Sequence, residues 1–347
     1  MIDGTPAGSR RVRLVGWTLA LTASAVLLLT AWLLIRLVES GPRPPFLDRE
    51  GHAAVGPPVA PKPGSLLRMA GSGSNLPLTR ALADEFLAKR PWLRVRVHES
   101  IGSTGGVRAT HDRALEIGLI SRPLNAEEQT LGLTVIPYAR VAVVLAANST
   151  VPVRGVSRTE LLALYAGDEE FWSDGSEVVV FQREPGDSGH LAARAAIEGF
   201  AEVDQRAWEA RRWSVLFHDR AMREALISTP GAVGLFDKGL AVIQDLPLAL
   251  LEYEGQRPTE EAVRTGSYPI TKDLSFVIDD DDADPLAREF IAFVFSADGQ
   301  RVIRESGYVP LAPPERSTFA HLRAVGPPPA RPSAKPEATS ETGPDGS

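Results

Sequence analysis

Apolar residues recur along the middle of the chain in three units, and each unit predicts a strand, a loop and a helix in that order. The strands are predicted over 66–69, 93–97 and 178–181, the loops over 70–75, 102–106 and 183–189, and the helices over 77–87, 107–114 and 191–200. A further strand is expected over 115–120. Strands that alternate with helices at this spacing indicate an α/β architecture with largely parallel sheets.

The three loops contain glycine and hydroxyl side chains where a strand leads into a helix. The first turn of a helix carries unpaired N–H groups and the positive end of the helix dipole, and glycine lets an anion approach the backbone closely. The first loop is neither a Walker loop nor a dinucleotide fingerprint, because no Gly-Lys-Ser/Thr follows it and Pro77 stands at the third glycine position. Each loop alone is compatible with an ordinary capped turn, so only their combination predicts an anion site.

Two arginines support an anion site. Arg122 follows the strand-like segment 116–121 and Arg183 follows 178–181, at the carboxyl ends of strands, where ligands bind in open α/β sheets. The planar guanidinium group is suited to tetrahedral oxyanions. The alternative is that both arginines form surface ion pairs within an acidic domain.

A long uncharged segment precedes the middle of the chain. The 22 residues from 14 to 35 carry no charge and would rise about 33 Å as a helix, enough to cross the hydrocarbon of a bilayer. Three arginines stand before this segment, so the positive-inside rule predicts a cytoplasmic N-terminus over 1–13 and a transmembrane anchor over 14–38. A cleaved signal peptide is the alternative, although the segment is long and ends without a small-residue cleavage site.

Proline distinguishes both flanks from a folded core. Eight of the 28 prolines fall within residues 1–64 and eight within 312–347, which leaves twelve for the 247 residues between them. The composition therefore predicts a proline-rich linker over 39–64 and a disordered tail over 312–347.

Composition excludes several kinds of chemistry. The chain has no cysteine, which excludes disulfides, thiolate metal sites and a cysteine nucleophile. Its six histidines are dispersed without a zinc-binding motif, so we expect no metal, no cofactor and no catalytic residue. The formal net charge is −7 for the whole chain and −10 for residues 65–311. This acidic balance argues against nucleic acid and, taken alone, against any anionic ligand.

Five segments carry a resemblance to a known family. They are AGSGSNLP, ESIGSTGGV, IGLISRPL, REPGDSGH and STPGAVGLFD. Together with VSRTELLALYAGDEEFWSDG, YPITKDLSFVI and FIAFVFSADGQRVIRESGYVPL, they resemble the phosphate-binding protein of high-affinity phosphate ABC transporters across residues 66–311. The resemblance implies a two-lobed α/β periplasmic binding protein fold of type II. This domain would follow the N-terminal transmembrane helix predicted above from the uncharged segment. Lobe 1 would comprise 65–138 and 231–311, and lobe 2 would comprise 139–230.

The resemblance also implies which residues bind the ligand. The family's contacts come from the first two loops, from the strand end that carries Ser121, and from the arginine loop. Where some members have an aspartate this chain has Ser121, and it is more similar to the subgroup with Ser-Arg there. The implied phosphate-binding residues are Asn75, Leu76 through its backbone, Ser103, Ser121, Arg122, Arg183, Asp187, Ser188 and Gly189.

Asp187 departs from the family pattern, because the third loop is one residue longer than the usual Arg-x-x-Gly-Ser-Gly-Thr. An aspartate at a helix start is often an N-cap. Alternatively, Asp187 accepts a hydrogen bond from protonated phosphate and thereby excludes a fully ionised oxyanion such as sulfate, or it disables the anion site. Asp219 is a further candidate, since it matches a polar position near the cleft in relatives.

These observations predict an extracytoplasmic solute-binding protein that captures inorganic phosphate, or a related oxyanion, and presents it to the transmembrane subunits of an ABC permease. A single-pass anchor would hold it in the inner (cytoplasmic) membrane, with the binding domain on the periplasmic side. We expect neither enzymatic activity nor nucleic-acid binding. The alternative is a membrane-anchored sensory or adaptor ectodomain of the same fold, with altered or lost oxyanion binding.

Overall fold

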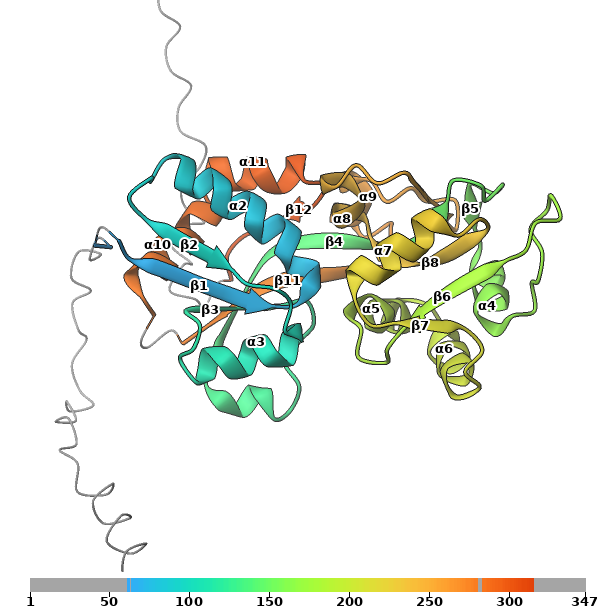
Figure 1. Ribbon diagram of the computed structural model, residues 1–347, viewed down its shortest axis with the longest axis horizontal. Coiled ribbons are helices and arrows are strands. Elements are labelled where there is room, and N and C mark those ends of the chain that lie inside the picture. The colour runs from blue at the N-terminus through green and yellow to red at the C-terminus, as the bar shows by residue number, and fades with distance from the viewer. Residues whose placement is uncertain (1–60, 63, 280–282, 315–347) are drawn as a thin grey trace, which may run out of the picture. The chain divides into compact units, whose positions relative to one another are not determined.

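The computed structural model describes residues 61–62, 64–279 and 283–314 (Figure 1). The predicted N-terminus 1–13 and anchor 14–38 lie outside the described residues, as do most of the predicted linker and tail. Within the described ranges, no helix has the length and apolar character needed to span a bilayer. The structure therefore bears on the middle of the chain.

The three predicted strand–loop–helix units are present. They are β1 (Leu66–Gly71) with α2 (Leu76–Ala88), β2 (Arg94–Val97) with α3 (Gly102–His111), and β6 (Val179–Arg183) with α5 (Ser188–Ala196). The predicted further strand is β3 (Ile117–Ile120). Two details differ from prediction. Residues 102–106 form the first turns of α3 rather than a loop, and the third helix ends at Ala196, because Gly199 takes a left-handed φ of 83° and a new helix follows.

Two long strands join the two halves of the molecule. β4 (Thr134–Asn148) pairs antiparallel with β11 (Thr271–Ile278) along its first part and with β8 (Ala232–Asp237) along its second. The resulting order is β2-β1-β3-β11-β4-β8-β6-β7, where β7 is Ser214–Leu216. Pairing is parallel among β1, β2 and β3 and among β6, β7 and β8. The sheet is therefore mixed, parallel within each half and antiparallel where the chain crosses.

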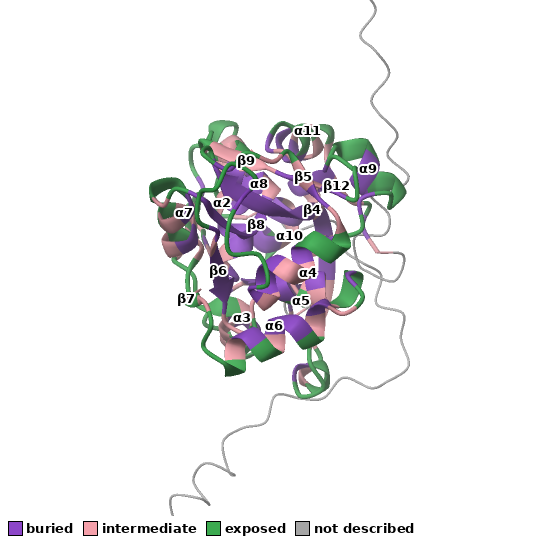
Figure 2. Cartoon of the chain, turned by 90° about the vertical axis from the view of Figure 1, so that its right-hand side faces the viewer, coloured by how far each residue is buried: buried purple, intermediate pink, exposed green. Residues whose placement is uncertain are grey.

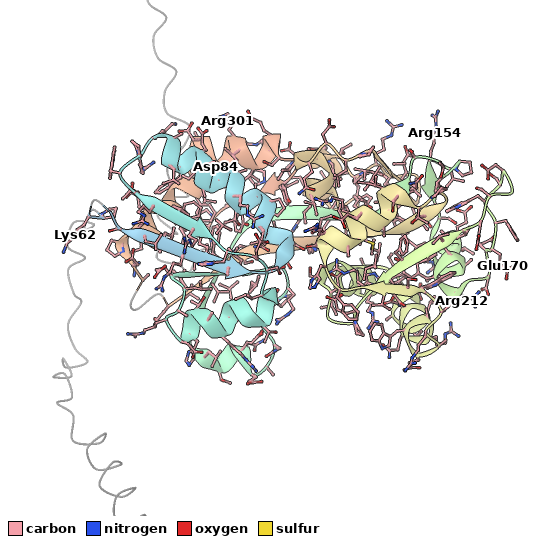
Figure 3. The ribbon with its side chains drawn as sticks, in the orientation of Figure 1. Lys62, Asp84, Arg154, Glu170, Arg212 and Arg301 are labelled. Carbon is pink, nitrogen blue, oxygen red and sulfur yellow. The ribbon has the colours of Figure 1, made fainter. Side chains whose placement is uncertain are left out.

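Helices and short strands complete the two halves. These elements are η1 (Gly73–Asn75), η2 (Glu128–Leu131), β5 (Gly155–Val156), α4 (Arg158–Ala166), α6 (Phe200–Glu209), α7 (Asp219–Ser228), α8 (Lys238–Ile243), β9 (Leu248–Leu250), β10 (Glu252–Tyr253), α9 (Glu260–Thr265), α10 (Pro285–Val294), α11 (Ala297–Glu305) and β12 (Val309–Pro310). Figure 2 shows the buried strands of the second half between helices whose outer residues are exposed. Charged side chains such as Asp84, Arg154 and Arg301 lie on the outside (Figure 3).

Two hydrophobic cores define the two lobes. The first core draws its buried residues from 67–141 and 274–308, and the second draws almost all of its residues from 142–270. The predicted assignment of 231–270 to lobe 1 is therefore wrong. β8 follows the expected crossing in sequence, but it pairs parallel with β6 and packs in the second core. The chain returns to the first lobe only along β11.

Glycines allow the loops of the first lobe to approach one another closely. Gly71 ends β1 with φ +151°, and a Cβ on it would lie 2.0 Å from the carbonyl oxygen of Leu119 in β3. A Cβ on Gly106 of α3 would lie 3.0 Å from the Cα of Gly71. The helix therefore packs directly on the ends of two strands, and this contact positions the polar loops on either side of it.

Candidate functional site

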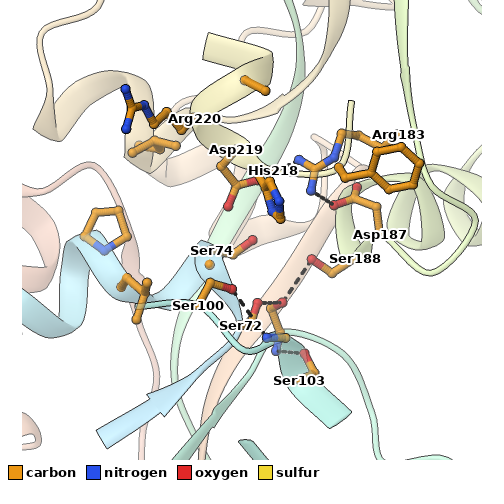
Figure 4. Close-up of a pocket in the computed structure, with 18 of the residues that line it drawn as sticks. Ser72, Ser74, Ser100, Ser103, Arg183, Asp187, Ser188, His218, Asp219 and Arg220 are labelled. Atoms are coloured by element: carbon orange, nitrogen blue, oxygen red, sulfur yellow. Dashed lines mark hydrogen bonds and ion pairs between the residues drawn. The ribbon is translucent and has the colours of Figure 1, made fainter. Parts of the chain in front are cut away.

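A pocket of about 920 Å³ is lined by loops of both lobes (Figure 4). The first lobe contributes the residues between β1 and α2, the start of α3 and the end of β3, and the second lobe contributes the loop after β6 and the start of α7. The sequence-predicted residues that line it are Leu76, Ser103, Ser121, Arg122, Arg183, Asp187 and Ser188. The structure thus brings together residues that are more than a hundred positions apart.

Asn75 and Gly189, also predicted to bind the ligand, are not among the residues that line the pocket. The Asn75 side chain is fully buried, and its Nδ2 lies 3.2 Å from the carbonyl oxygen of Ile120 and 3.4 Å from that of Ser275. It ties the start of α2 to β3 and β11. The Gly189 N–H donates to the Asp187 carboxylate at 2.9 Å. Both residues therefore hold the loops in place through contacts outside the pocket.

Buried hydroxyl groups form a connected row at the bottom of the pocket. Ser72 Oγ lies 2.6 Å from Ser121 Oγ, and Ser121 Oγ donates to Ser188 Oγ at 2.9 Å. The Ser121 N–H faces Ser103 Oγ at 3.4 Å. Ser72, Ser121 and Ser103 belong to the first lobe and Ser188 to the second, so the row crosses between the lobes.

Arg183 lies among three carboxylates. Its guanidinium is 2.7 Å from Asp219, 3.3 Å from Asp187 and 3.2 Å from Glu184. Burial disfavours the charge of Arg183, but these carboxylates outweigh that effect and raise its pKa well above the ordinary value. Arg183 is 8% exposed, whereas the side chains of Glu184 and Asp219 are 31% and 25% exposed, so water reaches these two ion pairs from the carboxylate side. Any anion that reaches Arg183 shares it with these carboxylates.

Asp187 is the N-cap of α5. One oxygen accepts the N–H groups of Gly189 and His190 at 2.9 and 3.0 Å, and the other faces Arg183. Burial opposes its ionisation, yet Arg183, Lys272 and these N–H groups together hold the pKa of Asp187 below its usual range. The N-cap interpretation of the inserted residue is therefore confirmed.

Asp219, the other aspartate considered from the sequence, lines the pocket at the start of α7. Its Oδ1 pairs with Arg183. A Cβ placed on Gly73 of the first lobe would lie 2.5 Å from its Oδ2, so this carboxylate reaches across to the opposite loop.

Arg122 lines the pocket, but its guanidinium group is already paired with a carboxylate. Its two terminal nitrogens each lie 2.7 Å from an oxygen of Glu128, and one of them also donates to Thr104 Oγ1 at 2.8 Å. Glu128 is 3% exposed, and the hydrogen bonds from Arg122 are the main reason that its pKa is lowered. Of the two interpretations of Arg122, the ion pair is the one the side chain adopts.

The sequence did not point to Lys272, a buried cation next to the pocket, or to the pocket hydroxyls Ser72 and Ser74. Lys272 lies in β11 and is 8% exposed. Its Nζ lies 2.9 Å from Ser74 Oγ, 2.8 Å from Ser188 Oγ and 2.8 Å from Asp237 Oδ1. A signal was present, because Lys272 occupies the same alternating phase as the buried Ile270 and Leu274. A lysine on the buried face of a strand needs polar partners nearby.

The described residues contain no group of three or more His, Cys, Asp and Glu side chains placed to hold a metal ion. The pocket offers hydroxyl and backbone donors, the arginines Arg80, Arg122, Arg183, Arg220 and Arg223, and several carboxylates. That set can bind an oxyanion by hydrogen bonds at three helix starts, and its carboxylates can accept a proton carried by the anion.

Comparison with known proteins identifies the family. The family model described as a PBP superfamily domain matches residues 53–298. The phosphate-binding protein PstS of Bacillus subtilis (strain 168) is 26% identical over 259 residues, which cover 72% of this chain and 82% of that protein. The PstS of Borreliella burgdorferi is 19% identical over 61% of this chain and 78% of its own length.

Solved structures show the same fold. A Clostridium perfringens protein described as a phosphate ABC transporter substrate-binding protein, with bound phosphate, matches with a TM-score of 0.63 and 21% identity over 71% of this chain and 100% of its own. An ABC-type phosphate transport receptor from Vibrio cholerae matches with a TM-score of 0.53 and 21% identity over 70% and 99%. The predicted two-lobed α/β binding-protein fold is confirmed, and so is the expectation that the chain is not an enzyme, since its relatives are transport binding proteins. The chain belongs to the PBP superfamily and is a PstS-like member of it.

Proposed function

We propose that this protein binds inorganic phosphate in the pocket between its lobes and delivers it to an ABC permease. One observation carries the proposal: the starts of α2, α3 and α5 all line the same pocket, at Leu76, Ser103 and Ser188. Helix starts supply N–H groups and a positive dipole end, which together favour an anion even in an acidic protein. The PstS relatives support phosphate as that anion.

The proposed contacts divide between the lobes. Ser103 would donate from the first lobe, and Ser188 and Arg183 from the second. The Leu76 N–H, which donates to the Gly73 carbonyl oxygen, would have to exchange that partner for the ligand, and Ser121 would act through Ser188, to which it donates its hydroxyl proton. Asn75 and Gly189 would support these loops without touching the ligand, and Arg122 would contribute mainly by fixing the loop that carries Ser121. Closure of the lobes around the ion would mark the loaded state for the permease.

The carboxylates beside Arg183 suggest how phosphate would be chosen over sulfate. Both oxygens of Asp187 already have partners within the protein, as described above. Asp219 reaches toward Gly73 across the pocket, so we propose it as the acceptor for a P–OH group. A fully ionised oxyanion has no proton to donate and would be repelled there.

We further propose that the protein acts outside the cytoplasm, tethered to the inner membrane by the apolar segment 14–38. A tether raises the local concentration of the loaded protein near a permease in the same membrane. The orientation follows from the arginines that precede the segment.

A sensory or adaptor ectodomain is the second candidate. The observation that favours it is the balance around Arg183, where three carboxylates face one guanidinium. If phosphate cannot displace or share these pairs, the fold would have kept its shape while losing its ligand.

Isothermal titration of the full-length protein in detergent tests the proposal. We expect heat of binding on addition of inorganic phosphate at neutral pH, and a Kd for sulfate that is at least about a hundredfold higher than the Kd for phosphate. Arg183→Ala should weaken phosphate binding by about 2 kcal/mol or more, because a buried charge-assisted contact is lost. Arg206→Ala, which removes an exposed arginine from α6 of the same lobe, is the control and should bind as the wild type does. Absence of heat with phosphate would reject the transport proposal in favour of the second candidate.

A further inference from the structure

Lys272 lies beneath the row of hydroxyl groups and contacts both lobes. Its Nζ reaches Ser74 of the first lobe at 2.9 Å and Ser188 of the second at 2.8 Å. Ser72, Ser74, Ser121 and Ser188 are each at most 8% exposed, so water does not compete strongly for these bonds. The ammonium group therefore holds a buried polar network at the point where the lobes meet.

The ammonium group and the geometry of the Ser121–Ser188 bond set the direction of the hydrogen bonds in this network. An ammonium group has only donors, so Ser188 Oγ must accept from Lys272. Ser188 Oγ also accepts from Ser121, whose single proton is then used, and Ser72 must in turn donate to Ser121. Ser72 therefore donates to Ser121, and Ser121 donates to Ser188. With two donors already directed at its oxygen, Ser188 has its own proton available for an acceptor in the pocket.

Lys272 also differs from the two arginines in its charge balance. Arg183 faces three carboxylates and Arg122 is held by both oxygens of Glu128. Lys272 has a single carboxylate partner, Asp237, at 2.8 Å, and its other two partners are neutral hydroxyls. Lys272 therefore faces fewer carboxylates at ion-pair distance than Arg183 does, while Asp187 also acts on its charge at longer range.

We infer that Lys272 is a positioning residue of the oxyanion site, which directs the Ser188 hydroxyl proton toward the bound anion and, through its positive charge, strengthens that hydroxyl as a donor. This inference rests on the proposed binding of phosphate in this pocket. Because the same Nζ holds Ser74, the residue also sets the position of the loop that leads into α2. Lys272 acts through the two serines rather than by lining the pocket itself.

A double-mutant cycle on the full-length protein tests the inference, with inorganic phosphate as the titrant. Lys272→Met keeps most of the length of the side chain but removes its charge and donors, and Ser188→Ala removes the directed hydroxyl. Each should raise the Kd for phosphate about tenfold or more. Because Lys272 acts through Ser188, the double variant should be no more than about threefold weaker than the weaker single variant. Lys238→Met is the matched control, since that neighbouring lysine bonds the carbonyl oxygen of Pro258 instead, and it should leave the Kd unchanged.

Asp237→Asn separates positioning from a purely structural ion pair. This change retains the shape of the Asp237 side chain and removes its charge. Lys272 would therefore keep its contacts with the two hydroxyls and lose the negative charge that neutralises it. We expect an unchanged or lower Kd for phosphate. If Asp237→Asn raises the Kd as much as Lys272→Met does, or if the effects of Lys272→Met and Ser188→Ala simply add, the inference is overturned.

The outcome for the wild type distinguishes this inference from the function on which it rests. If the wild type shows no binding of phosphate, the proposed function fails and the inference falls with it. If the wild type binds phosphate and folded Lys272→Met binds it equally well, only the inference fails. Should Lys272→Met not fold, the opposite outcomes expected for Asp237→Asn and Ser188→Ala still decide the matter.

Discussion

The two walls of the pocket are built from different chemistry. The wall from the first lobe presents mainly hydroxyls on closely packed loops, Ser72, Ser74, Ser100, Ser103, Thr104 and Ser121, and its arginines Arg80 and Arg122 are each paired with one carboxylate. The wall from the second lobe presents Arg183 among Glu184, Asp187 and Asp219. Neutral donors bind an anion only if the backbone places them accurately. A group of opposite charges attracts an anion only as far as its cations outweigh its carboxylates. The first wall should therefore be damaged most by substitutions that crowd its backbone. The second wall should be affected most by substitutions that change its charge.

This difference also explains how an acidic protein can hold an anion. The net charge acts over long range and is screened by salt, while a closed pocket responds to the dipoles and charges within a few ångströms. Here those near groups are three helix starts, the hydroxyl row, Arg183 and Lys272. The net charge of −7 is thus a poor guide to the ligand.

The largest expected effect is on the backbone of the first wall. Gly71→Ala would force a side chain into a backbone φ of +151° and place its Cβ 2.0 Å from the Leu119 carbonyl oxygen. We expect a loss of about 3 kcal/mol or more in the free energy of unfolding, measured by urea denaturation. Gly186→Ala is the control in the second wall, where a Cβ meets nothing within 4 Å, and it should change stability by less than about 0.5 kcal/mol. Equal effects of the two changes would contradict the proposed difference between the walls.

The two arginines provide the next test. Arg122→Ala leaves the Glu128 carboxylate, 3% exposed, with the Asn125 N–H but without a cation, so the free energy of unfolding should fall by about 3 kcal/mol. Phosphate affinity should fall less than for Arg183→Ala, since Arg122 already has its guanidinium occupied by Glu128 and Thr104. Adding Glu128→Gln should restore part of the stability, because no unpaired charge then remains. If Arg122→Ala instead abolishes binding without loss of stability, Arg122 is a direct ligand.

Local patterns predicted most of the elements that carry the site. The periodicity of 77–87 and 191–200 identified α2 and α5, because a helix with one buried face repeats its apolar residues over short distances in the chain. The composition of the loops likewise predicted which helix starts would meet. These features depend on neighbours within a few residues, which is why the sequence reveals them.

Long-range pairing was harder to predict. Lys272 contacts residues 84 and 198 positions away, and nothing near it in the chain indicates which hydroxyls it will meet. The assignment of 231–270 to lobe 1 failed for the same reason, since it depended on β8 pairing with β6. Asn75 has the polarity expected of a ligand, yet its amide turns inward to the carbonyl oxygens of β3 and β11. Polarity alone does not tell which way a buried amide points.

Lowering the pH should remove the contribution of Asp187, in the second wall, to the free energy of unfolding. Cations and helix N–H groups hold the pKa of Asp187 below its ordinary value of 3.8, despite burial. A carboxylate with a lowered pKa in the folded state stabilises the protein above the unfolded pKa, and this contribution is lost as the pH falls through the folded pKa. Asp187→Asn keeps an N-cap but removes the charge, so we expect a loss of about 1 kcal/mol at neutral pH. The difference from wild type in urea unfolding should shrink toward zero below 3.8, and a difference independent of pH would contradict the charge-based account.

The smallest expected effect concerns a single hydroxyl of the first wall. Ser103 Oγ accepts the Ser121 N–H at 3.4 Å, a long bond, so Ser103→Ala should lower the free energy of unfolding by less than about 0.5 kcal/mol. Its loss as a donor should still raise the Kd for phosphate about threefold to tenfold. Ser100→Ala is a useful comparison, because Ser100 already donates its proton to the Gly71 carbonyl oxygen at 3.1 Å and has none left for the anion. If Ser100→Ala weakens binding as much as Ser103→Ala does, the first wall acts through the general polarity of its loops and not through individually directed protons.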